Sequence, residues 1–179
     1  MRRIGEPEHN ILAMQGNLAA TYRVLGRSEE ALSMRRDVYS GWLRLKGEEH
    51  KETLRAANNY AVSLLDLRRF AEARSLMRPI TPVARRVLGE GHAITLRSRW
   101  IYAQTLYKDD GATLGDIREA VTTLEDTGRT ARRVFGVTHP TATGIAYDLQ
   151  KERAALAARE GDGVNSVREA MEAMAPGDA

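Results

Sequence analysis

Cysteine is absent from this 179-residue sequence. Its absence excludes disulfide frameworks and thiolate metal sites, and it permits a reducing compartment. The chain also lacks any run of ~18 consecutive apolar residues, which a membrane-spanning helix would need. Its first residues lack the apolar stretch of a secretory signal. These absences predict a soluble cytoplasmic protein with no membrane association.

Lysine is scarce as well, with only Lys46, Lys51, Lys108 and Lys151, so nearly all positive charge is carried by arginine. The net charge is +3, and arginine and glutamate alternate along nearly every segment. Nucleic-acid-binding proteins usually concentrate their basic residues on one face. A nucleic-acid partner is therefore not expected.

Histidine is rare, and its four copies are regularly spaced. His9, His50, His92 and His139 lie 41, 42 and 47 residues apart, and the last three each end a Gly-x-x-His string. The run ARRVLG at 84–89 also recurs as ARRVFG at 131–136. A fixed period of this size predicts a solenoid of stacked units, an architecture that usually serves as an extended binding surface.

Between successive Gly-x-x-His strings the apolar residues follow a helical period twice, with a polar turn between the two runs. Each unit is therefore predicted to be a helical hairpin. We expect one array over 9–175, with units at about 9–49, 50–91, 92–138 and 139–175, and tails at 1–8 and 176–179. An insertion at 110–116 accounts for the longer third interval.

Two details of individual helices are predicted. Pro79 and Pro82 fall inside the second helix of the second unit, where proline removes a backbone donor, so we expect a kink or break between Met77 and Val83. The fourth unit should turn at 161–163, and a short helix over 164–174 should close the stack.

Small residues recur where paired helices must approach closely. First helices carry the trios Leu18, Ala19, Tyr22, then Tyr60, Ala61, Leu64, then Tyr102, Ala103, Leu106; second helices begin near Ala31, Ala73 and Ala120. This pattern resembles the tetratricopeptide repeat. The 42-residue period and the Leu-Gly-x-x-His junction resemble kinesin light chain repeats in particular. The resemblance implies an all-α, right-handed superhelical solenoid of about four hairpins.

In that family the first helix of every unit lines a concave groove that binds an extended peptide. The resemblance therefore places the following residues in a peptide-binding groove: Asn17, Arg23, Arg55, Asn58, Asn59, Val62, Arg97, Trp100 and Gln104. Asn17 and Asn59 match an asparagine that holds the peptide backbone in the family, although either could instead bond a neighbouring helix.

Arg55 and Arg97 are equivalent residues of adjacent units, so both should lie on the same face and favour an acidic ligand. Each could equally be solvated or paired within the protein. Trp100 could form an aromatic floor for an apolar anchor or belong to the core.

Other chemistry finds little support. Histidines one repeat apart lie about one layer apart, beyond the ~2 Å ligand distances of a transition metal, so they are interpreted as residues that begin helices. Residues 111–115 are glycine-rich but lack the Lys-Ser/Thr ending of a phosphate loop. Asp109 and Asp110 are interpreted as solvated or capping groups. Neither a metal nor a cofactor is predicted.

The chaperone-tail-binding subtype does not fit, because Gly16 and Ala20 stand where its first clamp residues belong and Ile101 replaces its last arginine. The sequence thus predicts a non-catalytic protein-interaction scaffold that binds an acidic peptide. The alternatives are a structural or self-associating array, with exposed aromatic residues such as Trp42 and Trp100 at the contacts, and a regulatory subunit of an enzyme or motor.

Overall fold

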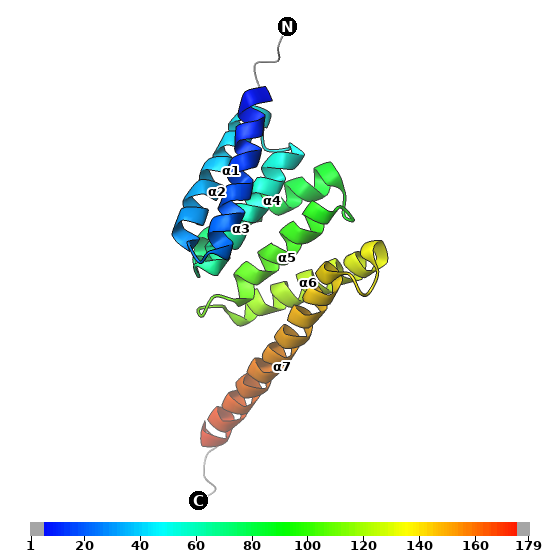
Figure 1. Ribbon diagram of the computed structural model, residues 1–179. Helices are drawn as coiled ribbons and strands as arrows, with labels where there is room; N and C mark the ends of the chain where they lie inside the picture. The colour runs from blue at the N-terminus through cyan, green and yellow to red at the C-terminus, as the bar shows by residue number, and fades with distance from the viewer. Residues whose placement is uncertain (1–5, 175–179) are drawn as a thin grey trace, which may run out of the picture.

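The computed structural model describes the backbone of residues 6–174 and the side chains of residues 8–161. This part of the chain forms seven helices and no strand: α1 (Glu6–Val24), α2 (Ser28–Lys46), α3 (Lys51–Asp66), α4 (Phe70–Leu88), α5 (Ala93–Tyr107), α6 (Leu114–Phe135) and α7 (Pro140–Met174). Each helix packs against the next along the chain, and successive pairs are stacked from one end of the molecule to the other (Figure 1). The predicted all-α repeat fold is confirmed.

Alanines fill the closest contacts inside the hairpins α1–α2, α3–α4 and α5–α6. Ala19, Ala61 and Ala103 of the first helices are fully buried, and so are Ala31, Ala73 and Ala120 of the second helices. A larger side chain at any of these positions would overpack a helix contact. The recurring small residues in the sequence therefore record where the helices approach each other.

The Gly-x-x-His strings are the junctions between hairpins. Gly89 ends α4 with a φ of 85°, a left-handed conformation that glycine adopts without strain. Three residues later the Nδ1 atom of His92 accepts a hydrogen bond from the backbone N–H of Ile94 at 3.1 Å, which caps α5. His50 and His139 cap α3 and α7 in the same way, at 3.2 and 3.1 Å. The prediction that histidines begin helices is confirmed for His50, His92 and His139, whereas it is wrong for His9, which lies inside α1.

The insertion in the third unit forms the connection between α5 and α6. Thr113 caps α6 in a reciprocal arrangement with Asp116, whose carboxylate accepts from the Thr113 backbone N–H at 3.0 Å. The carboxylate of Asp109 accepts from the N–H of Gly111, and Arg68 pairs with Asp110 at 2.7 Å. These residues build a turn and a helix start, so α6 already begins at Leu114, inside the predicted insertion.

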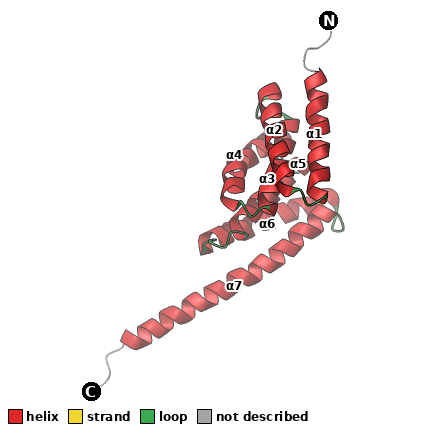
Figure 2. Ribbon diagram, turned by 60° about the vertical axis from the view of Figure 1, so that its left-hand side comes forward, coloured by secondary structure: helices red, strands yellow, loops and turns green. Residues whose placement is uncertain are grey.

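The fourth unit differs from the prediction. Residues 140–174 form the single helix α7, so the predicted turn at 161–163 and separate closing helix are wrong, and three hairpins are followed by one long helix. Figures 1 and 2 show α7 extending well beyond the stack. Two hydrogen bonds explain this course: Arg118 donates to Glu160, and Arg159 donates to the Ala112 carbonyl, so the segment before the glycines stays bound to α6 and its loop.

The predicted tails and membrane-spanning segments can be compared with the observed helices. Helix α1 already begins at Glu6, inside the predicted tail, whereas the predicted tail 176–179 lies outside the described residues. No helix within 6–174 combines the length and apolar character needed to cross a membrane.

The predicted break at the prolines of α4 is also wrong, since the helix runs unbroken from Phe70 to Leu88, whereas the predicted kink between Met77 and Val83 stays a prediction. Pro79 and Pro82 are both exposed, so water can reach the two carbonyls that lose a hydrogen-bond donor. Thr81 stabilises the same turn by donating to the Met77 carbonyl at 2.8 Å.

Charged pairs connect adjacent layers of the stack. Arg68 pairs with Asp110, Arg74 with Asp116, and Arg118 with Glu160, and the partners are 42 residues apart in every case. In each pair an arginine of one layer faces an acid of the next.

Candidate functional site

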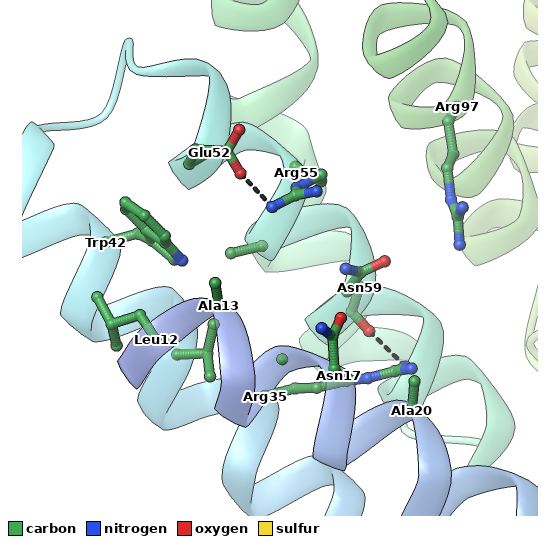
Figure 3. Close-up of a pocket in the computed structure, with 13 residues that line it drawn as sticks. Leu12, Ala13, Asn17, Ala20, Arg35, Trp42, Glu52, Arg55, Asn59 and Arg97 are labelled. Carbon is green, nitrogen blue, oxygen red and sulfur yellow. Dashed lines mark hydrogen bonds and ion pairs between the residues drawn. The ribbon is translucent and has the colours of Figure 1, made fainter. Parts of the chain in front are cut away.

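A hollow of about 290 Å³ opens beside α1, α3 and α5. Figure 3 shows its lining side chains converging from these helices and from α2. The apolar part of the lining consists of Leu12, Ala13, Val38, Trp42 and Ala56, and the polar part consists of Asn17, Arg35, Glu52, Arg55, Asn59 and Arg97. The hollow therefore has an apolar end and a cationic end, with Gly16 and Ala20 completing it.

Arg35 is the most constrained of the three arginines that line this hollow. Its side chain comes from α2 and is only 8% exposed. Its Nη1 atom donates to the backbone carbonyl of Asn59 and to the hydroxyl of Ser63, each at 2.9 Å. Burial, followed by repulsion from Arg23 and Arg97, lowers the pKa of Arg35, and Asp66 offsets part of that effect. The guanidinium is thus fixed in place with its charge only partly compensated.

Arg97 and Arg55 supply the other two charges. Arg97 is solvent-accessible at the edge of the hollow, yet desolvation and then repulsion from Arg23 lower its pKa. Arg55 forms an ion pair with Glu52, one turn earlier in α3. Within the described chain, neither Arg35 nor Arg97 forms an ion pair with a carboxylate.

The amides of Asn17 and Asn59 face this hollow, as Figure 3 shows. Neither side-chain amide has a hydrogen-bond partner among the described residues; only their backbone carbonyls are engaged, by Thr21 and Arg35 respectively. An amide presents both a donor and an acceptor. Both remain available to an incoming main chain.

A second hollow, of about 310 Å³, adjoins the first, because Arg97 lines both. Its other lining residues are Val62, Trp100, Ile101, Gln104 and Thr141. The two hollows together form a continuous surface over the first helices of successive hairpins, and we call this surface the groove.

Polar groups at the α5–α7 end of the groove are bonded internally. The indole N–H of Trp100 donates to the carboxylate of Asp148 at 2.7 Å, and the amide of Gln104 donates to the same carboxylate at 3.0 Å. Burial and the neighbouring Asp148 raise the pKa of the Tyr107 phenol. Asp148 therefore binds α7 to α5 and uses the donors that the sequence assigned to a ligand.

Two predicted groove residues lie elsewhere. Asn58 is 1% exposed; it donates to the Ile94 carbonyl at 3.1 Å and accepts from Ser98 at 2.8 Å, so it joins α3 to α5 inside the protein. Arg23 pairs with Asp66 and lines neither hollow. The remaining seven predicted residues line one or both hollows.

The comparison with protein families identifies the repeat. Residues 10–78, which span nearly all of the first hairpin, the whole of α3 and about half of α4, match the family model of the tetratricopeptide repeat. This part of the chain consists of tetratricopeptide repeats. No curated protein sequence matches the chain.

Solved structures show that the whole tetratricopeptide array has a kinesin light chain-like fold. One is a set of nearly identical repeats from a Podosopora anserina protein assigned as a kinesin light chain, with a TM-score of 0.73, 19% identity, and coverage of 100% of this chain and 80% of that one. Another is BtubC (BKLC) of P. vanneervenii, with a TM-score of 0.65, 18% identity, and coverage of 100% and 70%.

Three functional residues were not predicted from the sequence: Arg35 and Trp42, which line the groove, and Asp148, which binds the groove residues Trp100 and Gln104. Arg35 and Trp42 belong to α2, a second helix, whereas the family pattern points only to first helices. A signal was nevertheless present, because Arg35 interrupts the apolar stripe of Ala31, Leu32, Val38 and Trp42. Among the described side chains, no group of three or more histidines and acids could hold a metal ion.

Proposed function

We propose that this tetratricopeptide array is a non-catalytic scaffold that binds an extended, acidic segment of a partner protein along the groove. The observation that carries the proposal is the cationic hollow, where Arg35, Arg55 and Arg97 converge from three different helices. Side chains from several helices can meet a ligand only at a surface that the stack itself assembles.

The amides support an extended ligand. Asn17 and Asn59 occupy equivalent positions one repeat apart, and both leave their side-chain donor and acceptor unused within the described residues. An extended chain carries alternating N–H and C=O groups that two such amides can bond without recognising side chains. The amides would therefore supply affinity, and the arginines would select acidic residues.

The second hollow adds an apolar contact. Val62 and Ile101 lie beside the ring of Trp100, whose N–H is already bonded to Asp148. The ring thus offers apolar surface without an unsatisfied donor. A partner segment should accordingly carry an acidic residue for the first hollow and an apolar residue for the second.

Selection from a random peptide display library tests this function. We expect the full chain to enrich sequences rich in aspartate and glutamate. The double variant Arg55→Glu, Arg97→Glu should weaken binding of the selected peptides by more than about tenfold, because each loss removes a charge-assisted contact. The control is Arg36→Glu with Arg78→Glu, which makes the same charge change at exposed positions of α2 and α4 outside the groove. Equal binding by the two double variants would contradict the proposal.

Self-association is the second candidate function, and the outer face of α1 favours it. Ile11, Met14 and Leu18 are 54%, 70% and 44% exposed. Their equivalents one repeat later in α3 include Thr53 and Ala56, which are buried against neighbouring helices. The two tryptophans that the sequence suggested as contacts between copies are not exposed enough for that role. Trp42 is buried, and Trp100 is partly buried and bonded to Asp148.

The spacing of this stripe suits a second copy of the chain. Positions 11, 14 and 18 of α1 follow the three- and four-residue steps of a coiled-coil seam. An antiparallel pair would also place the Glu8 end of one α1 near the Arg23 end of the other. Light scattering over a concentration range should show a dimer that Met14→Glu with Leu18→Glu abolishes. A monomer at every concentration would remove this candidate.

A further inference from the structure

The cationic hollow carries more positive charge than it neutralises. Three guanidinium groups line it against a single carboxylate, Glu52, which is already paired with Arg55. Arg35 and Arg97 have no carboxylate partner among the described residues. Arg35 is only 8% exposed, and a charge removed from water in this way is usually paired, because unpaired burial is costly. An anionic ligand is the natural means of compensating both groups.

The number and origin of the donors indicate the shape of that anion. Guanidinium and amide donors reach the hollow from α1 (Asn17), α2 (Arg35), α3 (Arg55, Asn59) and α5 (Arg97). A carboxylate has two oxygens in one plane and carries one charge. A phosphoryl monoester has three acceptor oxygens and a charge of about −1.5 to −2 at pH 7. Donors converging from four helices on two uncompensated charges match the phosphoryl group better.

The site is also built before a ligand arrives. The bonds of Arg35 to Asn59 and Ser63 fix its guanidinium and use only Nη1, so the other N–H groups of its fork remain for a ligand. A preordered arginine loses less entropy on binding than a free one. Leu12, Val38 and Trp42 line the apolar end of the same hollow, against which the carbon part of a bound side chain can pack.

From these contacts we infer that the hollow is a subsite for a phosphorylated side chain of the partner, with Arg35 and Arg97 binding the phosphoryl oxygens. This inference rests on the proposed function, because the phosphorylated residue belongs to the segment that occupies the groove. Phosphorylation of the partner would then control its attachment to the scaffold.

The first experiment uses inorganic phosphate as the probe. Calorimetric titration of the full chain at constant ionic strength should detect binding, and Arg97→Gln should weaken it about tenfold, the effect of losing one charge-assisted contact. Arg97 makes no ion pair with a described residue, so this variant should fold normally. Arg78→Gln is the matched control on the exposed side of α4 and should bind like the wild type. Equal binding by both variants would overturn the inference.

Arg35 is tested by Arg35→Lys, which keeps the charge but loses the planar fork. Phosphate binding should fall at least severalfold while circular dichroism reports an unchanged fold. If the variant is misfolded, the comparison of Arg97→Gln with Arg78→Gln still decides the question.

The second experiment separates this inference from the proposed function. Three peptide libraries with identical flanks carry serine, glutamate or phosphoserine at the centre. The phosphoserine library should bind about tenfold more tightly than the glutamate library, and Arg97→Gln should remove most of that difference. Equal binding of the phosphoserine and glutamate libraries would contradict the phosphoryl subsite but would remain consistent with a groove that binds acidic peptides. Binding of inorganic phosphate without binding of any library overturns the groove and leaves the anion subsite standing.

Discussion

At the α1–α3 end of the groove, Arg35 and Arg97 lack a carboxylate partner among the described residues, whereas at the α5–α7 end Trp100 and Gln104 both donate to Asp148. The same face of the repeat is thus open at one end and closed at the other. The repeat pattern therefore places a side chain on the groove without deciding whether the side chain's donors and acceptors are free. Because α7 carries Asp148 opposite α5, the donors of Trp100 and Gln104 bind this carboxylate and are no longer free to bind a ligand.

The closed end depends on a close contact between α5 and α7. A Cβ atom at Gly144 would lie 2.4 Å from Cη2 of Trp100 and 2.8 Å from Cζ2, both atoms of a large ring. Gly144→Leu should therefore separate the helices and lower the free energy of unfolding by ~3 kcal/mol, at the upper end of the cost of overpacking. Urea denaturation measures the change. Gly161→Leu is the control, because no atom lies within 4 Å of its Cβ position; a similar loss in both variants would show that the Trp100 contact is not the cause.

The adjacent residues Asn58 and Asn59 of α3 have different roles at the open end of the groove. Asn58→Ala should lower the free energy of unfolding by ~2 kcal/mol, because it leaves the Ile94 carbonyl and the Ser98 hydroxyl without their buried partner. Asn59→Ala should leave stability unchanged, since only the Asn59 backbone is bonded, and should weaken binding of a selected peptide. Thermal unfolding and peptide titration of both variants check this division. The reverse pattern would contradict it.

Removing Asp148 should open the closed end. Asp148→Ala leaves the Trp100 and Gln104 donors to water, so we expect a loss of ~1 kcal/mol in the free energy of unfolding. The NMR resonance of the Trp100 indole N–H should move towards its solvent-exposed position and exchange faster. Asp126→Ala, a change to an acid of α6 remote from the groove lining, should leave that resonance in place. An unmoved resonance in Asp148→Ala would show that the hydrogen bond is not formed in solution.

The smallest effect concerns Glu152, one turn after Asp148. Burial, and to a lesser extent Asp148, raises the pKa of Glu152 despite the opposing charge of Lys151. Because the pKa is higher in the folded state, ionisation of Glu152 destabilises the protein above that pKa, and the cost disappears below the unfolded value of about 4.3. Glu152→Gln should therefore raise the melting temperature at pH 7 by a few degrees and leave it unchanged near pH 4. The exposed Glu48→Gln should show no such difference, and a pH-independent gain in Glu152→Gln would exclude this cause.

Much of the fold could be predicted because the repeat multiplies weak signals. A single Gly-x-x-His string is uninformative, but three at one period locate every junction, where glycine ends one helix and His50, His92 or His139 caps the next. The buried alanines were visible for the same reason. The prolines of α4 were misinterpreted, because exposure decides whether a freed carbonyl can be hydrated, and exposure was not evident from local sequence.

The site was harder to predict because side-chain direction changes by ~100° per residue in a helix. Asn58 and Asn59 are adjacent in sequence, yet one faces the interior and the other the groove. Arg35 enters from a second helix, and Asp148 from the atypical last unit, so neither belongs to the positions that recur. The positions that recur in every unit predict the helical scaffold. The properties of the groove depend on residues, such as Arg35 and Asp148, that do not recur.

The charged pairs between layers limit how such an array can grow. If the α3–α4 hairpin were copied and inserted beside itself, Arg68 would face the arginine of the copy instead of Asp110. This mismatch replaces a favourable pair by a repulsive one of similar size, about 0.3–0.5 kcal/mol at an exposed helix surface. The hairpins are therefore not interchangeable parts. The charges at each boundary fit only the existing order of hairpins. An array lengthened by simple duplication would need compensating substitutions at the new boundary.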